Sequence, residues 1–424
     1  MQLNSYWLTT APTFSAGQQA FTQEHYDVAV VGGGFTGLSA ARTLARGGAR
    51  VALLEASQLI GEASGRNGGQ CNTGVAQDYA SLVEQFGRER AIAHYTTYAE
   101  AVSSVEQVIA EETINCDYLR HGKLKLAAKP EHYDKLARTC DAIRRDVDSG
   151  VEMLSATAVR EEVDSPLYYG GLLQHNGGQM HMGRFGIGLA EAAASHGAHL
   201  FEHTPMTRLT REKSAYRLGT PSGDIRAENV LLATGASQTG PLSWFRRRLV
   251  PVGSFIVVTE PLSAAQCAQF LPQRRSYVTS RIVGHYFRLT ADNRLLFGGR
   301  ARFAMSGSQS DAKSGEILRR GLEEAFPQLK GVRLDYCWGG LVDMSKDRFP
   351  HAGQHNGMYY AMGYSGHGVQ MSVHMGHVLG DVILGNRQNH PWQDTKWPAI
   401  PGHFGKPWFL PLVGSWYRLQ DRLH

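Results

Sequence analysis

A run of glycines at the start of a helical pattern constrains the fold more than any other part of the sequence. The stretch VAVVGGGFTGLSAARTL, residues 28–44, places Gly32, Gly34 and Gly37 in a G-x-G-x-x-G spacing directly after a short apolar run. In a strand–turn–helix unit the first glycine makes the tight turn, the second lets a pyrophosphate approach, and the third lets helix and strand pack closely. The pattern predicts a dinucleotide site at a helix N-terminus, with a plain tight turn as the alternative.

An acidic residue follows at the expected distance. Glu55 ends the next apolar run, ARVALLEA, about 20 residues further on, where a carboxylate can accept hydrogen bonds from both ribose hydroxyls. A carboxylate would repel the extra phosphate of NADP, so the ligand is expected to be NAD or FAD.

Length and composition bound the remaining possibilities. A chain of 424 residues favours two domains, or one large domain with an insertion. The net charge is +5, and the basic residues are scattered apart from the arginines at 246–248, so we expect no nucleic-acid partner. Five cysteines without a CxxC pair indicate reduced thiols, and no leader or long apolar run is visible, which predicts a cytoplasmic protein without a membrane span.

The remaining pattern alternates between strand-like and helical segments. Residues 80–147 read as helical, and 198–236 alternate like strands around the turn PSGD before closing on LLATGAS. Further strands are expected in 250–262, a hairpin around ADNR in 284–303, helices in 183–197, 312–329 and 367–385, and a strand in 357–366.

Two more segments carry small residues suited to close approach by a ligand. GEASGRNGGQ, residues 61–70, offers backbone N–H groups and Arg66 to a phosphate, with a flexible polar loop as the alternative. In MGYSGHGVQ, residues 362–370, three glycines would let a strand-to-helix turn lie against a flat ring, with simple helix capping as the alternative. His367 is either a ligand contact or a packed histidine.

Together with YFRLTADNRLLFGG and FPQLKGVRLDYCWGG, these segments resemble the FAD-dependent D-amino-acid oxidase/glycine oxidase superfamily, and most of all its γ-glutamylputrescine oxidase branch. The resemblance implies an α/β (α+β) fold, in which a glutathione-reductase-like FAD-binding Rossmann domain carries an inserted mixed or antiparallel-sheet substrate domain. The expected boundaries are 24–80, 178–245 and 340–390 for the FAD domain, 81–177 and 246–339 for the substrate domain, and 391–424 for a Trp/Pro-rich tail.

The resemblance also implies the chemistry. A neutral amine loses a hydride to flavin N5, the imine is hydrolysed by water, and O₂ is reduced to H₂O₂. The protein orients the amine, and a dry pocket that favours its unprotonated form removes the need for a strong base. The residues that match the family's FAD contacts are Gly32, Gly34, Phe35, Thr36, Gly37, Glu55, Ala56, Ser64, Arg66, Asn67, Gly68, Gly69, Gln70, Met206, Thr234, Gly235, Gly363, Ser365, Gly366, His367, Gly368, Val369 and Gln370.

Departures from the sarcosine oxidase pattern bear on substrate and acceptor. Gln370 stands where those enzymes have a lysine that pairs with the substrate carboxylate, and glutamine carries no charge. The segment RLLFGG begins with Arg294 and contains no lysine for oxygen activation, so a quinone or another acceptor stays open beside O₂. Tyr286 and Arg288 alternate along one strand and are expected to face the pocket together, with sheet packing as the alternative. The candidate catalytic residues are Tyr286, Arg288, His367 and Gln370.

One cysteine and two histidines are further candidates for chemistry. Cys337 lies near the place where sarcosine oxidases attach FAD covalently, but a buried free thiol is the other interpretation, and FAD is expected to be non-covalent. His374 and His377 stand at i, i+3 on a helix without a third ligand, so no metal is expected.

Four functions follow from these features. The leading one is FAD-dependent oxidation of a small-molecule amine, γ-glutamylputrescine or a similar polyamine derivative. The second is an oxidase or dehydrogenase of a secondary or cyclic amino acid such as L-pipecolate or sarcosine, with Arg66 or Arg288 holding the carboxylate. The others are a non-catalytic flavin-binding protein and a nicotinamide dehydrogenase.

Overall fold

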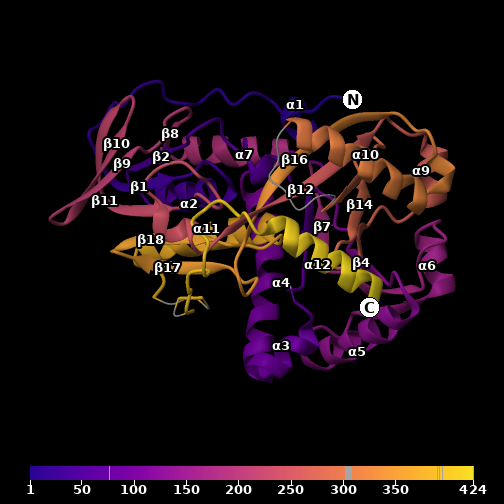
Figure 1. Cartoon of the computed structure of the whole chain (residues 1–424). Helices are drawn as coiled ribbons and strands as arrows, with labels where there is room; N and C mark the ends of the chain where they lie inside the picture. The colour runs from indigo at the N-terminus through magenta and orange to yellow at the C-terminus, as the bar shows by residue number, and fades with distance from the viewer. Residues whose placement is uncertain (76, 301–307, 389, 391, 394, 424) are drawn as a thin grey trace.

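Two large sheets organise the described part of the chain (Figure 1), and each of them has eight strands there. The computed structural model describes residues 1–424 except 76, 301–307, 389, 391, 394 and 424. The first sheet has the order β17-β18-β11-β1-β2-β8, and β10 and β9 extend it from β11. Its strands are β1 His25–Val31, β2 Val51–Leu54, β8 His199–Phe201, β9 Arg208–Glu212, β10 Ala215–Thr220, β11 Gly223–Leu232, β17 His351–His355 and β18 Met358–Met362.

The expected βαβ unit forms the centre of this sheet. Strands β1 and β2 pair in parallel, and helix α2, Phe35–Arg46, connects them. All four residues of β2 are buried, as befits a parallel strand with both faces covered. A Cβ at Gly37 would lie 1.9 Å from the carbonyl oxygen of Gly32, so only glycine lets α2 begin this close to the strand. This confirms the packing role predicted for the third glycine.

The second sheet is mixed, with the order β16-β12-β15-β14-β13-β4-β6-β5. Strand β13 runs parallel to β4, and the other pairs are antiparallel. The predicted fold class is thereby confirmed, while the exact domain boundaries stay a prediction. The strands are β4 Lys123–Leu126, β5 Glu152–Ser155, β6 Gly170–Gln174, β12 Val250–Thr259, β13 Ser276–Thr279, β14 His285–Leu289, β15 Leu295–Gly299 and β16 Leu334–Met344; β3 Gln70–Asn72 pairs separately with β7 Gly177–Gln179.

The helices expected in 183–197, 312–329 and 367–385 are present as α7, α10 and α11, whereas α1, α6, α8 and α9 were not expected. Residues 80–147 are not uniformly helical, because strand β4 interrupts them, and the tail contains a helix, α12, that the sequence analysis missed. The helices are α1 Tyr6–Thr9, α3 Tyr79–Phe86, α4 Arg88–Glu111, α5 Pro130–Asp146, α6 Ala156–Glu162, α7 Met182–Ser195, α8 Ser243–Arg246, α9 Ala264–Phe270, α10 Ser308–Ala325, α11 Gly368–Ile383 and α12 Leu410–Leu423, with short 3₁₀ turns at Ala63–Gly65 and Pro327–Leu329.

Packing between α2 and α11 brings the two glycine-rich turns together. A Cβ at Gly376 would lie 2.4 Å from the carbonyl oxygen of Thr36, so the helices meet backbone to backbone at this point. The Thr36 hydroxyl lies 2.8 Å from the Tyr364 hydroxyl, and Ser39 donates to the Val373 carbonyl at 2.6 Å. The N-termini of both helices therefore open on the same side of the first sheet.

No helix among the described residues is long and apolar enough to cross a membrane.

Candidate active site

A cavity of about 1460 Å³ lies where the glycine-rich turns meet the second sheet. Its walls include the N-termini of α2 and α11, the loop 61–70, the turn 233–239 after β11, and parts of β4, β14 and β16. The predicted residues that line it are Gly32, Gly34, Phe35, Thr36, Glu55, Ala56, Ser64, Arg66, Asn67, Gly68, Gln70, Met206, Thr234, Gly235, Tyr286, Ser365, Gly366, His367, Gly368, Val369 and Gln370. Four others lie behind this wall, namely Gly37, Gly69, Arg288 and Gly363.

Glu55 is fixed beside the first glycine-rich turn. Its Oε2 accepts a hydrogen bond from the Gly33 amide at 2.7 Å, and its Oε1 accepts one from the Ser57 amide at 2.8 Å. A carboxylate has about four acceptor positions, so it can still accept from a ribose.

The loop 61–70 is held from its outer side. Five consecutive carbonyls, those of residues 65–69, each accept a hydrogen bond from a distant part of the chain. The pairs are Ser5 Oγ to Gly65 O at 2.6 Å, Trp338 Nε1 to Arg66 O at 3.0 Å, Trp7 Nε1 to Asn67 O at 2.7 Å, Arg288 Nε to Gly68 O at 2.8 Å, and Met180 N to Gly69 O at 3.0 Å.

With its carbonyls engaged, the loop presents amide groups to the cavity. The N–H groups of Asn67 and Gly68 have no acceptor within the described part of the chain. Two adjacent backbone donors in a buried wall suit a ligand edge that carries negative charge.

Arg288 supports this loop and does not share the pocket face expected for it. Its side chain is 3% exposed, and it donates to the carbonyls of Gly68 and of Met180, the latter at 2.7 Å. Burial lowers the pKa of the guanidinium to about 9. The predicted pocket position is therefore wrong, because the guanidinium is committed to backbone carbonyls below the loop, and Arg288 is not placed to hold a substrate carboxylate.

Replacing Arg288 with methionine is expected to lower the free energy of unfolding by about 2 kcal/mol, because it removes the side-chain donor from the carbonyls of Gly68 and Met180 at about 1 kcal/mol each, whereas the Leu289 carbonyl keeps Gln179 as a donor. Thermal and urea unfolding would measure the change. Arg320→Met on the exposed side of α10 is the matched control, since its side chain is 79% exposed. Equal stability of the two variants would contradict the supporting role of Arg288.

Tyr286 faces the cavity as expected. Its hydroxyl lies 3.2 Å from the Ser254 hydroxyl, and burial raises its pKa to about 12, so it stays neutral at physiological pH.

The N-terminus of α11 presents two neutral polar side chains. Gln370 is 1% exposed, and its Nε2 donates to the Asn72 carbonyl at 2.6 Å. His367 lines the cavity, and its buried Nδ1 has no hydrogen-bond partner within the described residues. Burial, with added repulsion from Lys123 and Lys125, lowers the pKa of His367 to about 3, so its ring is uncharged.

The sequence analysis missed two lysines that line the cavity. Lys123 and Lys125 alternate along β4 and therefore point to one side of the sheet. Lys123 donates to the Thr73 carbonyl at 2.7 Å, and burial lowers its pKa to about 7. Burial also lowers the pKa of Lys125. The alternation K-L-K-L of residues 123–126 indicates a strand with both lysines on one face. This signal was overlooked because residues 80–147 as a whole were predicted to be helical.

Asp343 was missed as well. Its Oδ2 accepts a hydrogen bond from the Gly363 amide at 2.6 Å, and burial raises its pKa to about 6. It lines the cavity between the turn after β11 and the turn before α11.

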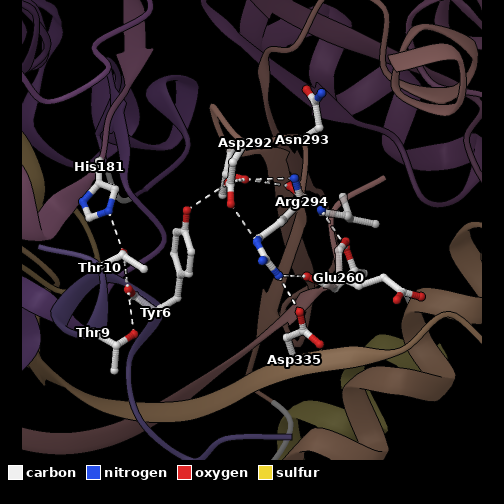
Figure 2. A network of polar contacts seen from close by, with 12 residues as sticks. Tyr6, Thr9, Thr10, His181, Glu260, Asp292, Asn293, Arg294 and Asp335 are labelled. Atoms are coloured by element: carbon white, nitrogen blue, oxygen red, sulfur yellow. Dashed lines mark hydrogen bonds and ion pairs between the residues drawn. The ribbon is translucent and has the colours of Figure 1, made fainter. Parts of the chain in front are cut away.

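Arg294 lies outside the cavity wall, in a polar network that fastens the N-terminal arm to the β14–β15 hairpin (Figure 2). It donates to Asp292 and to Asp335, both at 2.7 Å, and the Tyr6 hydroxyl donates to Asp292 at 2.9 Å. Trp7, the neighbour of Tyr6, donates to the loop carbonyl at Asn67. The network thus positions the arm that supports the loop 61–70.

Covalent attachment at Cys337 is contradicted by its position. The thiol is fully buried in the core against α10, where Sγ donates to the Asp311 carbonyl at 3.2 Å, and it does not reach the cavity wall. Burial raises its pKa to about 12.

The two helical histidines have other neighbours. His374 Nδ1 lies 2.8 Å from the Ser104 hydroxyl, and His377 Nε2 lies 3.5 Å from Asp381. Among the described residues, no group of three or more His, Cys, Asp or Glu side chains is placed to hold a metal ion.

The donors around the cavity fit a dinucleotide joined to a flat ring. Two helix N-termini, the free amides of Asn67 and Gly68, and the unpartnered Nδ1 of His367 all border the same space. The acidic Glu55 lines the same cavity beside the first glycine-rich turn, where it could accept from a ribose.

Comparison with known proteins agrees with this geometry. The family model described as DAO, FAD dependent oxidoreductase, matches residues 27–382. The oxidoreductase OrdL of Haemophilus influenzae is 32% identical over 89% of this chain and 88% of its own, and the gamma-glutamylputrescine oxidoreductase of Escherichia coli is 31% identical over 99% and 98%.

A solved structure shares the fold. Glycine oxidase from Geobacillus kaustophilus superposes with a TM-score of 0.69 at 22% identity, over 90% of this chain and 99% of its own. The chain is an enzyme of the DAO family of FAD-dependent oxidoreductases, which act on amine and amino-acid substrates.

Proposed function

We propose that this enzyme oxidises a C–N bond of γ-glutamylputrescine or a similar polyamine derivative, in which the carboxylate is remote from the reacting carbon. The observation that carries the proposal is the placement of charge around the cavity. Gln370, in the first turn of α11, is neutral, whereas the lysines Lys123 and Lys125 lie on the strand β4.

The cofactor sites follow from the geometry. The turn 32–37 would hold the pyrophosphate at the N-terminus of α2, and Glu55 would accept from the ribose. The amides of Asn67 and Gly68 and the turn 363–370 would hold the ring. The bound flavin supplies the hydride acceptor, and the protein supplies binding and orientation.

The wall near β4 carries charges of both signs. Besides the two lysines it includes Lys135 of α5 and Asp78, which begins α3. The Asp78 carboxylate is held by the Thr139 hydroxyl at 2.8 Å and by the Ala80 amide at 3.0 Å. A γ-glutamyl group ends in an α-carboxylate and an α-ammonium, so the lysines would bind the first and Asp78 the second.

Two of the groups proposed to lie beside the reacting end, Tyr286 and His367, are neutral. The Tyr286 hydroxyl and the His367 ring can hydrogen-bond to an amine without adding charge. A buried site of this kind favours the unprotonated amine, which is the form that can lose a hydride.

The pKa of Lys123 predicts a pH dependence. Its ammonium form, which binds a carboxylate, is present below pH about 7 and is lost as the pH rises through that value. The ratio of kcat/KM for γ-glutamylputrescine to kcat/KM for putrescine should therefore fall above pH 7. Putrescine has no carboxylate for Lys123 to bind, and both substrates carry an amine that must lose its proton before oxidation, so the ratio isolates the effect of Lys123. A ratio that is constant from pH 6 to 9 would contradict carboxylate binding by Lys123.

A second candidate is a secondary or cyclic amino acid such as sarcosine or L-pipecolate. Arg300 lines the cavity near Tyr286 and offers a cation to a carboxylate next to the reacting carbon. Arg66 also lines the cavity, but its guanidinium already donates to the carbonyls of Gly61 and Gly339.

A substrate panel separates the two candidates. Turnover of γ-glutamylputrescine, putrescine, sarcosine, L-pipecolate and glycine would be followed by peroxide release and, in parallel, by reduction of an artificial dye, so that the result does not depend on O₂ as acceptor. The proposal predicts the highest kcat/KM for γ-glutamylputrescine. Turnover of the small α-amino acids alone would overturn it.

A further inference from the structure

The C-terminal segment 404–423 exposes a stripe of large apolar side chains. Of the eleven exposed large apolar residues among the described part of the chain, six lie in this segment. They are Phe404, Trp408, Leu412, Trp416, Leu419 and Leu423. Within α12 the spacing of 4, 3 and 4 residues places the last four on one helix face.

The opposite face of α12 is packed against the body of the protein. Leu410, Val413 and Tyr417 contact the apolar residues around Val252. The Asp421 carboxylate accepts hydrogen bonds from the amides at 282 and 283, at 2.9 and 2.8 Å. The helix is therefore held along the surface (Figure 1, yellow), and the large apolar side chains of its other face are exposed.

Exposed basic residues lie in this segment and beside it. Lys406 and Arg418 are exposed, and Arg281 is exposed next to Ile282, whose amide contacts Asp421. Asp421 is the one acidic residue in 404–423, and its carboxylate is turned to backbone amides. The segment thus exposes tryptophan and leucine together with lysine and arginine, and the whole chain has a net charge of +5.

We propose that the outer face of α12 docks on an anionic membrane surface, with the helix lying in the plane of the interface. Helices bind there when Trp, Phe and Leu enter the boundary between headgroups and acyl chains while Lys and Arg contact anionic headgroups. A second copy of the chain is a poorer occupant, because a two-fold contact through this stripe would bring the same basic side chains together.

Docking in this way would place the cavity beside the lipid. Tyr417 and Gln420, on the inner side of the same helix, line the cavity. The catalytic cavity would then open next to the membrane surface rather than to bulk solvent.

Vesicle co-sedimentation of the FAD-loaded full chain tests the proposal. Phosphatidylcholine vesicles with phosphatidylglycerol are expected to bind the protein, and pure phosphatidylcholine vesicles to bind it at least about 10-fold more weakly, with binding to the anionic vesicles falling as salt is raised. Equal binding to both lipids, or no sedimentation with either, would overturn the proposal.

The double variant Leu412→Gln, Trp416→Gln removes two side chains of the stripe and leaves the cavity wall unchanged. It is expected to bind anionic vesicles about 100-fold more weakly, because each lost apolar contact is worth about 10-fold. Ile317→Gln, at an exposed apolar residue on α10, is the matched control and should bind like the wild type. Light scattering that shows a dimer broken by the double variant would instead identify a second copy as the occupant and overturn the membrane assignment.

Discussion

Replacing Gly37 with valine is expected to give a protein that is purified without bound flavin. A Cβ at this position would lie 1.9 Å from the carbonyl oxygen of Gly32, and the two branches of valine add to the overlap. Helix α2 must then move away from β1, which removes its N-terminus from the place where the pyrophosphate would bind. We expect the affinity for FAD to fall at least about 100-fold, or about 2.7 kcal/mol.

Absorbance of the purified protein near the flavin maximum measures this effect, and far-ultraviolet circular dichroism shows whether the fold is retained. Gly17→Ala is the matched control, since a Cβ there meets its nearest atoms at ordinary contact distance, 3.4 Å. A Gly37→Val protein that folds and binds FAD like the wild type would show that this turn does not hold the cofactor.

Replacing Lys125 with methionine is expected to lower kcat/KM for γ-glutamylputrescine by about 10- to 100-fold. A hydrogen bond between charged partners contributes about 1.5–3 kcal/mol, and methionine keeps the apolar stem while removing the ammonium. The loss should appear mainly in KM, because the carboxylate is remote from the reacting carbon and is held equally before and during the reaction. Lys123→Met should act in the same direction and abolish the fall of the substrate ratio above pH 7.

Putrescine supplies the internal comparison for these variants. It has no carboxylate, so its kcat/KM should change less than about 2-fold in either variant. Lys330→Met, at an exposed lysine far along the chain from β4, controls for the change in net charge. Parallel losses with both substrates would assign the lysines to general stability or to the cofactor and not to the γ-glutamyl group.

Local patterns predicted the parts of the fold that depend on neighbouring residues. The βαβ unit and the hairpin around ADNR follow from short apolar runs and turn residues, and the structure confirms both. Helix α12 was missed because Pro407 and Pro411 interrupt the pattern, although proline is tolerated in the first turn of a helix.

The site was harder to predict where its contacts span long sequence separations. Arg288 donates to the carbonyls of Gly68 and Met180, which are 220 and 108 residues away in the sequence. The local alternation of β14 shows which side of the sheet the side chain faces, but not whether it meets these carbonyls or a pocket. Lys123 and Lys125 were missed because β4 has four residues and lies between two helices. The assignment of each residue to the flavin or to the substrate stays a prediction.

Anaerobic titration of the bound flavin with a panel of amines separates amine oxidation from the later steps, because the flavin itself is then the electron acceptor. We expect γ-glutamylputrescine to bleach the flavin spectrum at lower concentration and with a higher rate than putrescine, sarcosine, L-pipecolate or glycine. Bleaching by sarcosine or L-pipecolate with no response to γ-glutamylputrescine, or a flavin that no amine bleaches, would contradict it.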